Sequence, residues 1–182
     1  EFAERGFAAA SMEAVARRAG VAKGLLYHYF PGGKADMFGA VVRGMMQRPL
    51  ADAEQRVAAG GSCADTLRAL LAQAVVAAED PRWRVLDKLM IAEGDRFPEL
   101  ADLYHAEVMR RAEALIGGVL REGVARGEFR PEARDWPPHL FMAPAVLLCT
   151  WKLTFGDRHA LDAGALHRAH LELVLGGLLA RA

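Results

Sequence analysis

The sequence contains little cysteine, no long apolar run and no excess of one charge. Only two of the 182 residues are cysteines, Cys63 and Cys149, and they lack the CxxC spacing of a zinc site and the density of a disulfide framework. No stretch of about 18 uncharged apolar residues is present, and the start lacks the basic and then apolar pattern of a secretory signal. We therefore expect a cytoplasmic protein without a membrane segment.

The first residues continue a helical pattern. The chain opens on Glu1 and carries no initiator methionine there, so we expect that the amino terminus lies upstream and that the first helix is truncated.

Strands are also missing from the pattern, because apolar and polar residues nowhere alternate. Apolar residues instead recur at intervals of three and four, which is the spacing of one face of a helix. Glycine and proline separate these stretches. The breaks fall at 20, 31–33, 60–62, 81, 98, 127–131, 137–138 and 156–157. This pattern predicts an all-α protein of about nine helices, the last two at about 137–156 and 162–181.

The net charge of zero hides an uneven distribution. Residues 1–48 contain seven Lys or Arg against four acids, a balance of +3, which leaves −3 for the remainder. A positive amino-terminal module on a mildly acidic body suits a protein that binds phosphates with one end.

No set of residues indicates an enzyme, a cofactor site or a metal site. A nucleophile, a base and an orienting group cannot be assembled from the sequence. Gly32-Gly33-Lys34 lacks both the Ser or Thr and the preceding strand of a phosphate-binding loop. His167 and His170 have nearly helical ligand spacing, but no acid or cysteine completes a metal site. We expect no catalytic residue, no cofactor and no metal.

Residues 11–30 have the pattern of a helix-turn-helix. Ser11 can cap a short helix, because its hydroxyl can accept a hydrogen bond from an unpaired backbone N–H group. Gly20 follows where a positive φ would let the chain turn, and a second short helix runs to Phe30. Two short helices joined in this way place the second one in the major groove of DNA. Lys34 then opens a longer helix.

Three segments near the start of the chain carry a family resemblance. They are Phe2-Ala-Glu-Arg-Gly-Phe7, the helix-turn-helix with Lys-Gly-Leu-Leu-Tyr-His-Tyr-Phe at 23–30, and Pro-Gly-Gly-Lys at 31–34. Together they resemble the DNA-binding domain of TetR-type regulators. The resemblance implies an all-helical homodimer with a DNA-binding domain at 1–45. It also implies a ligand-binding and dimerisation domain at 46–182, in which the last two helices pair with their twofold copies.

The resemblance also implies which residues face DNA. They are Ser11, Lys23, Gly24, Leu25, Tyr27, His28, Tyr29 and Lys34, of which Lys34 would clamp a phosphate. Leu26 and Phe30 would turn inward. The chain departs from the family at two positions. Ala22 replaces the small hydroxyl residue that is usual there, and Leu25 replaces a residue that is often polar. Phosphate contacts and DNA shape are therefore expected to carry more of the affinity than base contacts. The alternative for Tyr27 and Tyr29 is that they are core aromatics of a small helical domain.

The middle helices are rich in aromatic residues and methionine, as small-molecule pockets are. The expected ligand-binding residues are Trp83, Met90, Phe97, Tyr104, His105, Met109, Phe141 and Trp151. Ordinary core packing is the alternative for each of them.

The sequence thus predicts a ligand-responsive transcriptional repressor. It would bind double-stranded operator DNA as a homodimer and be released by a small, largely apolar effector. The alternative is a DNA-binding regulator controlled by a protein partner.

Overall fold

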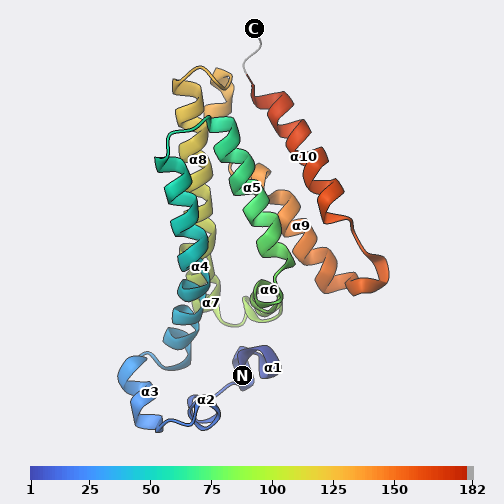
Figure 1. Cartoon of the computed structure of the whole chain (residues 1–182). Coiled ribbons are helices and arrows are strands. Elements are labelled where there is room, and N and C mark those ends of the chain that lie inside the picture. The colour runs from blue at the N-terminus through green and yellow to red at the C-terminus, as the bar shows by residue number, and fades with distance from the viewer. Residues whose placement is uncertain (180–182) are drawn as a thin grey trace. The chain divides into compact units, whose positions relative to one another are not determined.

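The fold is all-α, as predicted (Figure 1). The computed structural model describes residues 1–179, apart from the side chains of Leu50 and Asp157. Helices α7, η1 and α8 continue into one another, so the described residues form nine helices besides two short 3-10 turns, and none of these residues forms a strand. The elements are α1 (Phe2–Ala9), α2 (Met12–Ala19), α3 (Lys23–Tyr29), α4 (Gly33–Ala58), α5 (Cys63–Glu79), α6 (Pro81–Glu93), α7 (Pro98–Tyr104), η1 (His105–Met109), α8 (Arg110–Ala125), η2 (Pro131–Asp135), α9 (His139–Phe155), η3 (Gly156–His159) and α10 (Ala163–Leu178).

The helix boundaries follow the predicted glycine and proline breaks. Pro81 and Pro98 each occupy the first position of a helix, where a missing N–H group costs nothing. Gly20 adopts a φ of 68° and ends α2. Two prolines lie inside helices instead, Pro49 in α4 and Pro144 in α9. The last helix was predicted to reach Arg181, which lies outside the described residues; within them α10 ends at Leu178.

The chain divides into two compact units. The first unit consists of Glu1–Arg48 and Val85–Met109, and the second of Pro49–Arg84 and the chain from Arg110 onward. Aromatic rings fill the core of the first unit. Phe7 contacts Phe2, Phe38 and Phe97, with ring centroids 5.8, 5.9 and 5.1 Å away.

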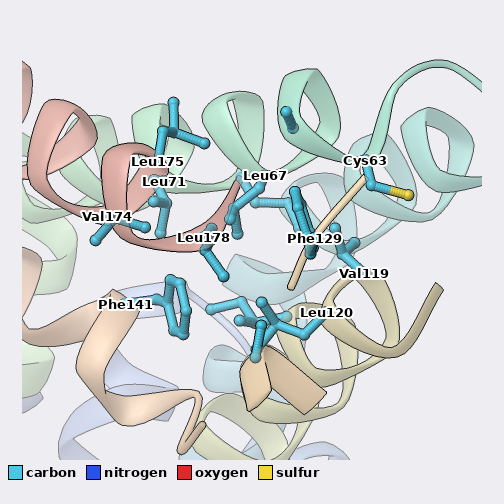
Figure 2. Close-up of a cluster of buried hydrophobic side chains, with 14 of the residues drawn as sticks. Cys63, Leu67, Leu71, Val119, Leu120, Phe129, Phe141, Val174, Leu175 and Leu178 are labelled. Carbon is cyan, nitrogen blue, oxygen red and sulfur yellow. The ribbon is translucent and has the colours of Figure 1, made fainter. Parts of the chain in front are cut away.

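The core of the second unit is built from α5, α8, α9 and α10 (Figure 2). Leu67, Leu120 and Leu178 are completely buried, one each from α5, α8 and α10. Phe129 enters the same cluster from the segment after α8. Burying a large apolar side chain contributes about 1.5–3 kcal/mol, so this cluster supplies much of the stability of the unit.

A proline shapes the contact between α9 and α10, which pack on each other. Pro144 has no N–H group and therefore cannot bond to the carbonyl oxygen of Leu140 one turn earlier. The ring of His170 in α10 lies against the backbone of Leu140, which raises the pKa of His170, and its Nε2 atom is buried without a hydrogen-bond partner. The N–H group of Leu140 already donates to Pro137, so the group that His170 meets is the carbonyl left by Pro144.

His170 should make the stability of the protein depend on pH. Burial lowers the pKa of His170, and nearby His167 lowers it further, against the opposing effect of the backbone of Leu140. The folded protein therefore favours the neutral ring, and stability is fully present above the unfolded pKa of about 6.5 and is lost as the pH falls below it. Urea denaturation at pH 7.5 and pH 5 should show this loss. His170→Gln should reduce it, whereas His159→Gln, at an exposed histidine, should not.

Candidate functional site

The turn between α2 and α3 is fixed by local hydrogen bonds. The N–H group of Ala14 donates to the hydroxyl of Ser11 at 3.1 Å, which confirms the predicted cap of α2. At the other end, Gly20 lies in the left-handed region and its N–H group donates to the carbonyls of Ala16 and Arg17. Residues other than glycine rarely adopt this conformation, so Gly20 lets α3 leave at an angle to α2.

Helix α3 presents large side chains to solvent. Leu25, Tyr27 and Tyr29 are 45%, 42% and 67% exposed. Lys23, Gly24 and His28 are also exposed, whereas Leu26 and Phe30, which the resemblance turns inward, are half-buried. Leu25 and Tyr29 are four positions apart and lie on the same side of α3, and exposed apolar side chains grouped in this way are unusual in a free protein. This face of α3 is therefore available to a partner.

Lys23, at the start of α3, is held by neighbouring groups. Its ammonium forms an ion pair with Glu13 of α2 and lies 5.5 Å from the centre of the Tyr27 ring. The bond to Glu13 raises the pKa of Lys23. Ala22 caps α3 without a side-chain hydrogen bond, as expected from its missing hydroxyl. The ion pair with Glu13 uses one of the three N–H donors of the ammonium, which leaves donors for a phosphate or a base.

Lys34 has partners that differ from the expected phosphate. Its ammonium donates to the carbonyl oxygens of Phe7, Ala8 and Ala10 at 2.8, 3.1 and 3.4 Å. An ammonium has three N–H donors, so in this conformation all of them are used within the protein. Lys34 meets these carbonyl groups because α1 ends beside the start of α4, and the last carbonyl groups of a helix lack a partner within it.

Sequence reasoning missed Glu93 at the end of α6. Its carboxylate accepts hydrogen bonds from the N–H groups of Phe7 and Ala8 at 2.8 and 2.7 Å. Glu93 lies 86 positions from Phe7 along the chain, so no local pattern pointed to it. The available signal was Gly6, a glycine inside a helical pattern.

The residues predicted to bind a ligand lie in both units. Met90, Phe97, Tyr104, His105 and Met109 belong to the first unit, and Trp83, Phe141 and Trp151 to the second. Two of them pack in cores: Phe97 against Phe7, and Phe141, 1% exposed, in the cluster of the second unit.

Three other predicted ligand residues, Tyr104, His105 and Met109, lie close together in the chain where α7 continues into η1. His105 is the first residue and Met109 the last residue of the π-helix η1. Tyr104 comes directly before it, and the hydroxyl of Tyr104 donates to Asp87 at 3.1 Å. Irregular turns of this kind are frequent at functional sites. Trp151 instead donates its indole N–H to the carbonyl of His159 at 2.6 Å. An open hollow of about 390 Å³ in the second unit contains none of the predicted residues; it is lined by Arg130, Pro131, Glu132, Gly176, Gly177 and Leu179.

Among the described residues, no three or more His, Cys, Asp or Glu side chains converge as metal ligands would. None of the described helices combines the length and the apolar character needed to cross a membrane.

The fold and the exposed α3 define a helix-turn-helix DNA-binding protein. A family model described as bacterial regulatory proteins of the tetR family matches residues 1–41, and a tetracyclin repressor-like C-terminal domain matches residues 57–170. The chain is 30% identical to the HTH-type transcriptional repressor KstR2 of Rhodococcus jostii over 97% of this chain and 85% of the relative. The chain belongs to the TetR family of transcriptional regulators. Members of this family are in general DNA-binding proteins and not enzymes.

Solved structures show the same fold at lower identity. The regulator FadR of Bacillus subtilis, in complex with stearoyl-CoA, is 20% identical with a TM-score of 0.72, and the match covers 97% of this chain and 92% of FadR. The fatty acid degradation regulator FadR of Bacillus halodurans is 22% identical with a TM-score of 0.73, over 99% of this chain and 91% of that one.

Proposed function

We propose that the protein is a cytoplasmic repressor that binds operator DNA as a homodimer and is released by a small, largely apolar effector. The exposed face of α3 carries this proposal. In a twofold dimer two such helices fit successive major grooves when they lie about 34–36 Å apart. We propose a DNA-binding domain at 1–45 and a domain for ligand binding and dimerisation at 46–182.

The proposed DNA contacts come from α3 and the cap of α2. They are Ser11, Lys23, Gly24, Leu25, Tyr27, His28 and Tyr29. Gly24 has no atoms within reach of an added Cβ, so the backbone can approach DNA closely there. The hydroxyl groups of the tyrosines and the ring of His28 suit phosphates, and Leu25 suits a thymine methyl group. Lys34, the predicted phosphate clamp, donates to three carbonyl oxygens, so a phosphate contact would require its ammonium to exchange one of them.

The dimer would form through α9 and α10. Leu140, Val146 and Leu147 of α9 are 51%, 54% and 44% exposed, and Leu173 of α10 is 76% exposed. Helix α9 is apolar on nearly every side, so it needs covering beyond its own core contacts. A second copy of the chain would cover both helices in a twofold interface.

The effector site would include Tyr104, His105 and Met109 around the π-helix η1. A largely apolar wall with a few polar groups is usual for such sites. The FadR structure with stearoyl-CoA shows that this fold can hold a ligand with a long apolar chain. The rival proposal is control by a protein partner, which would dock on exposed residues instead of filling a pocket.

Selection of DNA by the protein tests this function. A random double-stranded pool should yield an enriched sequence with two half-sites, and sedimentation should show one dimer on each site. Stearoyl-CoA and other apolar molecules are then added to the complex. Release by one of them supports the proposed effector class. Release by none favours the protein-controlled alternative, and failure to enrich any sequence removes the DNA-binding proposal.

Lys23→Ala should weaken DNA binding by about tenfold and lower the dependence of log Kd on log salt by about one, because one phosphate contact is lost. If Lys23 reads a base instead, the variant will also discriminate less between operator and mutated operator. Kd measurements over a salt series decide between these results. Lys88→Ala, at an exposed lysine of α6, is the matched control and should bind as the wild type does. Unchanged binding by Lys23→Ala would remove Lys23 from the DNA face.

A further inference from the structure

Helix α1 is interrupted at Gly6. This residue has φ 75° and ψ 175°, a combination that is essentially limited to glycine. The break separates Phe2–Arg5 from the residues at 7–9, so a new helical turn begins at Phe7. The first N–H groups of a turn have no partner within it and need one from elsewhere.

Glu93 supplies that partner. Its two carboxylate oxygens each accept one of the N–H groups of Phe7 and Ala8. A Cβ atom at Gly6 would overlap the Oε1 atom of Glu93, so the close approach itself requires glycine. The backbone of Glu93 is fixed in turn, because its carbonyl accepts from the N–H groups of Arg96 and Phe97 at 3.0 and 2.9 Å.

Lys34 binds the carbonyl groups of the same turn. Its ammonium takes the carbonyl oxygens of Phe7, Ala8 and Ala10, and it lies 4.6 Å from the centre of the Phe7 ring. A negative group at the N–H end and a positive group at the C=O end both match the dipole of this turn. Phe7 is 1% exposed and Ala10 is 4% exposed, so the turn is also fixed by packing.

We infer that Glu93 and Lys34 are positioning residues for DNA binding. Together they hold the turn at 7–10, which leads directly into Ser11, the cap of α2 and the first residue of the helix-turn-helix. Both act through the backbone and not through a contact with DNA. The inference rests on the proposed DNA-binding function, since it gives these two residues the task of orienting α2 and α3 toward operator DNA.

The charge of Glu93 makes the inference easy to test. Removal of an acid makes the protein more positive, so electrostatics alone would strengthen its binding to DNA. We expect the opposite for Glu93→Ala: operator binding weaker by about tenfold to a hundredfold, the equivalent of losing hydrogen bonds to a charged group. Glu93→Gln keeps one acceptor oxygen, so it should lose less operator affinity than Glu93→Ala. Glu99→Gln, at an exposed acid of α7, is the matched charge control and should bind at least as well as the wild type.

Lys34 separates positioning from phosphate binding. Lys34→Met removes all donors and should weaken operator binding, and Lys34→Arg, which can still donate to carbonyls, should recover part of the loss. A phosphate contact would instead make Lys34→Met weaken all DNA alike and would leave Glu93→Ala without a defect. Each Kd is normalised to the fraction of protein that is active in a stoichiometric titration, so that a loss of folded protein does not count as a loss of affinity.

Hydrogen exchange provides a readout that does not depend on DNA. Glu93→Ala should speed amide exchange in residues 7–29, while the core helices of the second unit exchange as in the wild type. Operator affinity equal to or tighter than that of the wild type, or unchanged exchange in α2 and α3, would overturn the inference. If the wild type selects no operator, the proposed function fails, and the exchange data still decide whether Glu93 orders the helix-turn-helix.

Discussion

Phe129→Ala should lower the free energy of unfolding by about 3–5 kcal/mol, which is the usual cost of removing a buried phenylalanine ring. Phe129 is 2% exposed and lies in the core cluster of the second unit, and its N–H group donates to the carbonyl of Gly123 at 3.0 Å. The deletion leaves a cavity that its neighbours fill only in part. Urea denaturation followed by circular dichroism measures the change.

Two variants bracket this result. Phe129→Leu should cost less than Phe129→Ala, because it leaves a smaller cavity. Val76→Ala, at a residue that is 69% exposed on α5, should change stability by less than about 0.5 kcal/mol. A Phe129→Ala variant as stable as Val76→Ala would show that Phe129 does not fill the core.

Gly123→Ala is expected to destabilise the protein by about 1–3 kcal/mol through overpacking. Gly123 is buried in α8, and a Cβ atom there would overlap the ring of Phe129. Alanine normally stabilises a helix by about 1 kcal/mol relative to glycine. Gly118→Ala should show that gain, because Gly118 lies in the same helix and an added Cβ would meet nothing within 4 Å. A glycine-to-alanine substitution in α8 should therefore lower the free energy of unfolding at position 123 and raise it at position 118.

A double-mutant cycle tests the cause. Without the ring of Phe129, the Cβ at position 123 has room, so Gly123→Ala should cost little in the Phe129→Ala background. A coupling of about 0.5–3 kcal/mol is expected for residues in direct contact. Additive effects would mean that the cost at Gly123 comes from some other source than the ring.

The sequence predicted the helices well because their ends are determined locally. Gly20, Pro81 and Pro98 act on their own backbone, whatever the rest of the chain does. Pro49 and Pro144 lie inside helices instead, so a proline in the sequence does not always mark a helix end. The π-helix η1 was not predicted either, because one extra residue in a turn leaves no mark in a pattern of threes and fours.

The candidate site could be predicted where it depends on neighbours in the chain. The cap at Ser11 and the exposed face of α3 follow from residues within one or two turns. The partners of Lys34 and the contribution of Glu93 depend on which distant helices meet, and charge and spacing say nothing of that. The expected phosphate contact of Lys34 treated its ammonium as free, whereas the carbonyl groups at the end of α1 accept hydrogen bonds from it.

Pro144 has a consequence for the alignment of α9 and α10. Apolar surfaces attract without direction, so two apolar helices can slide along one another by a turn at little cost. The ring of His170 can approach the carbonyl of Leu140 because Pro144 leaves that carbonyl without its helical donor. A polar contact between otherwise apolar helices favours one register, as a buried polar residue does in a coiled coil. Pro144 thus favours one alignment of the two helices proposed to form the dimer.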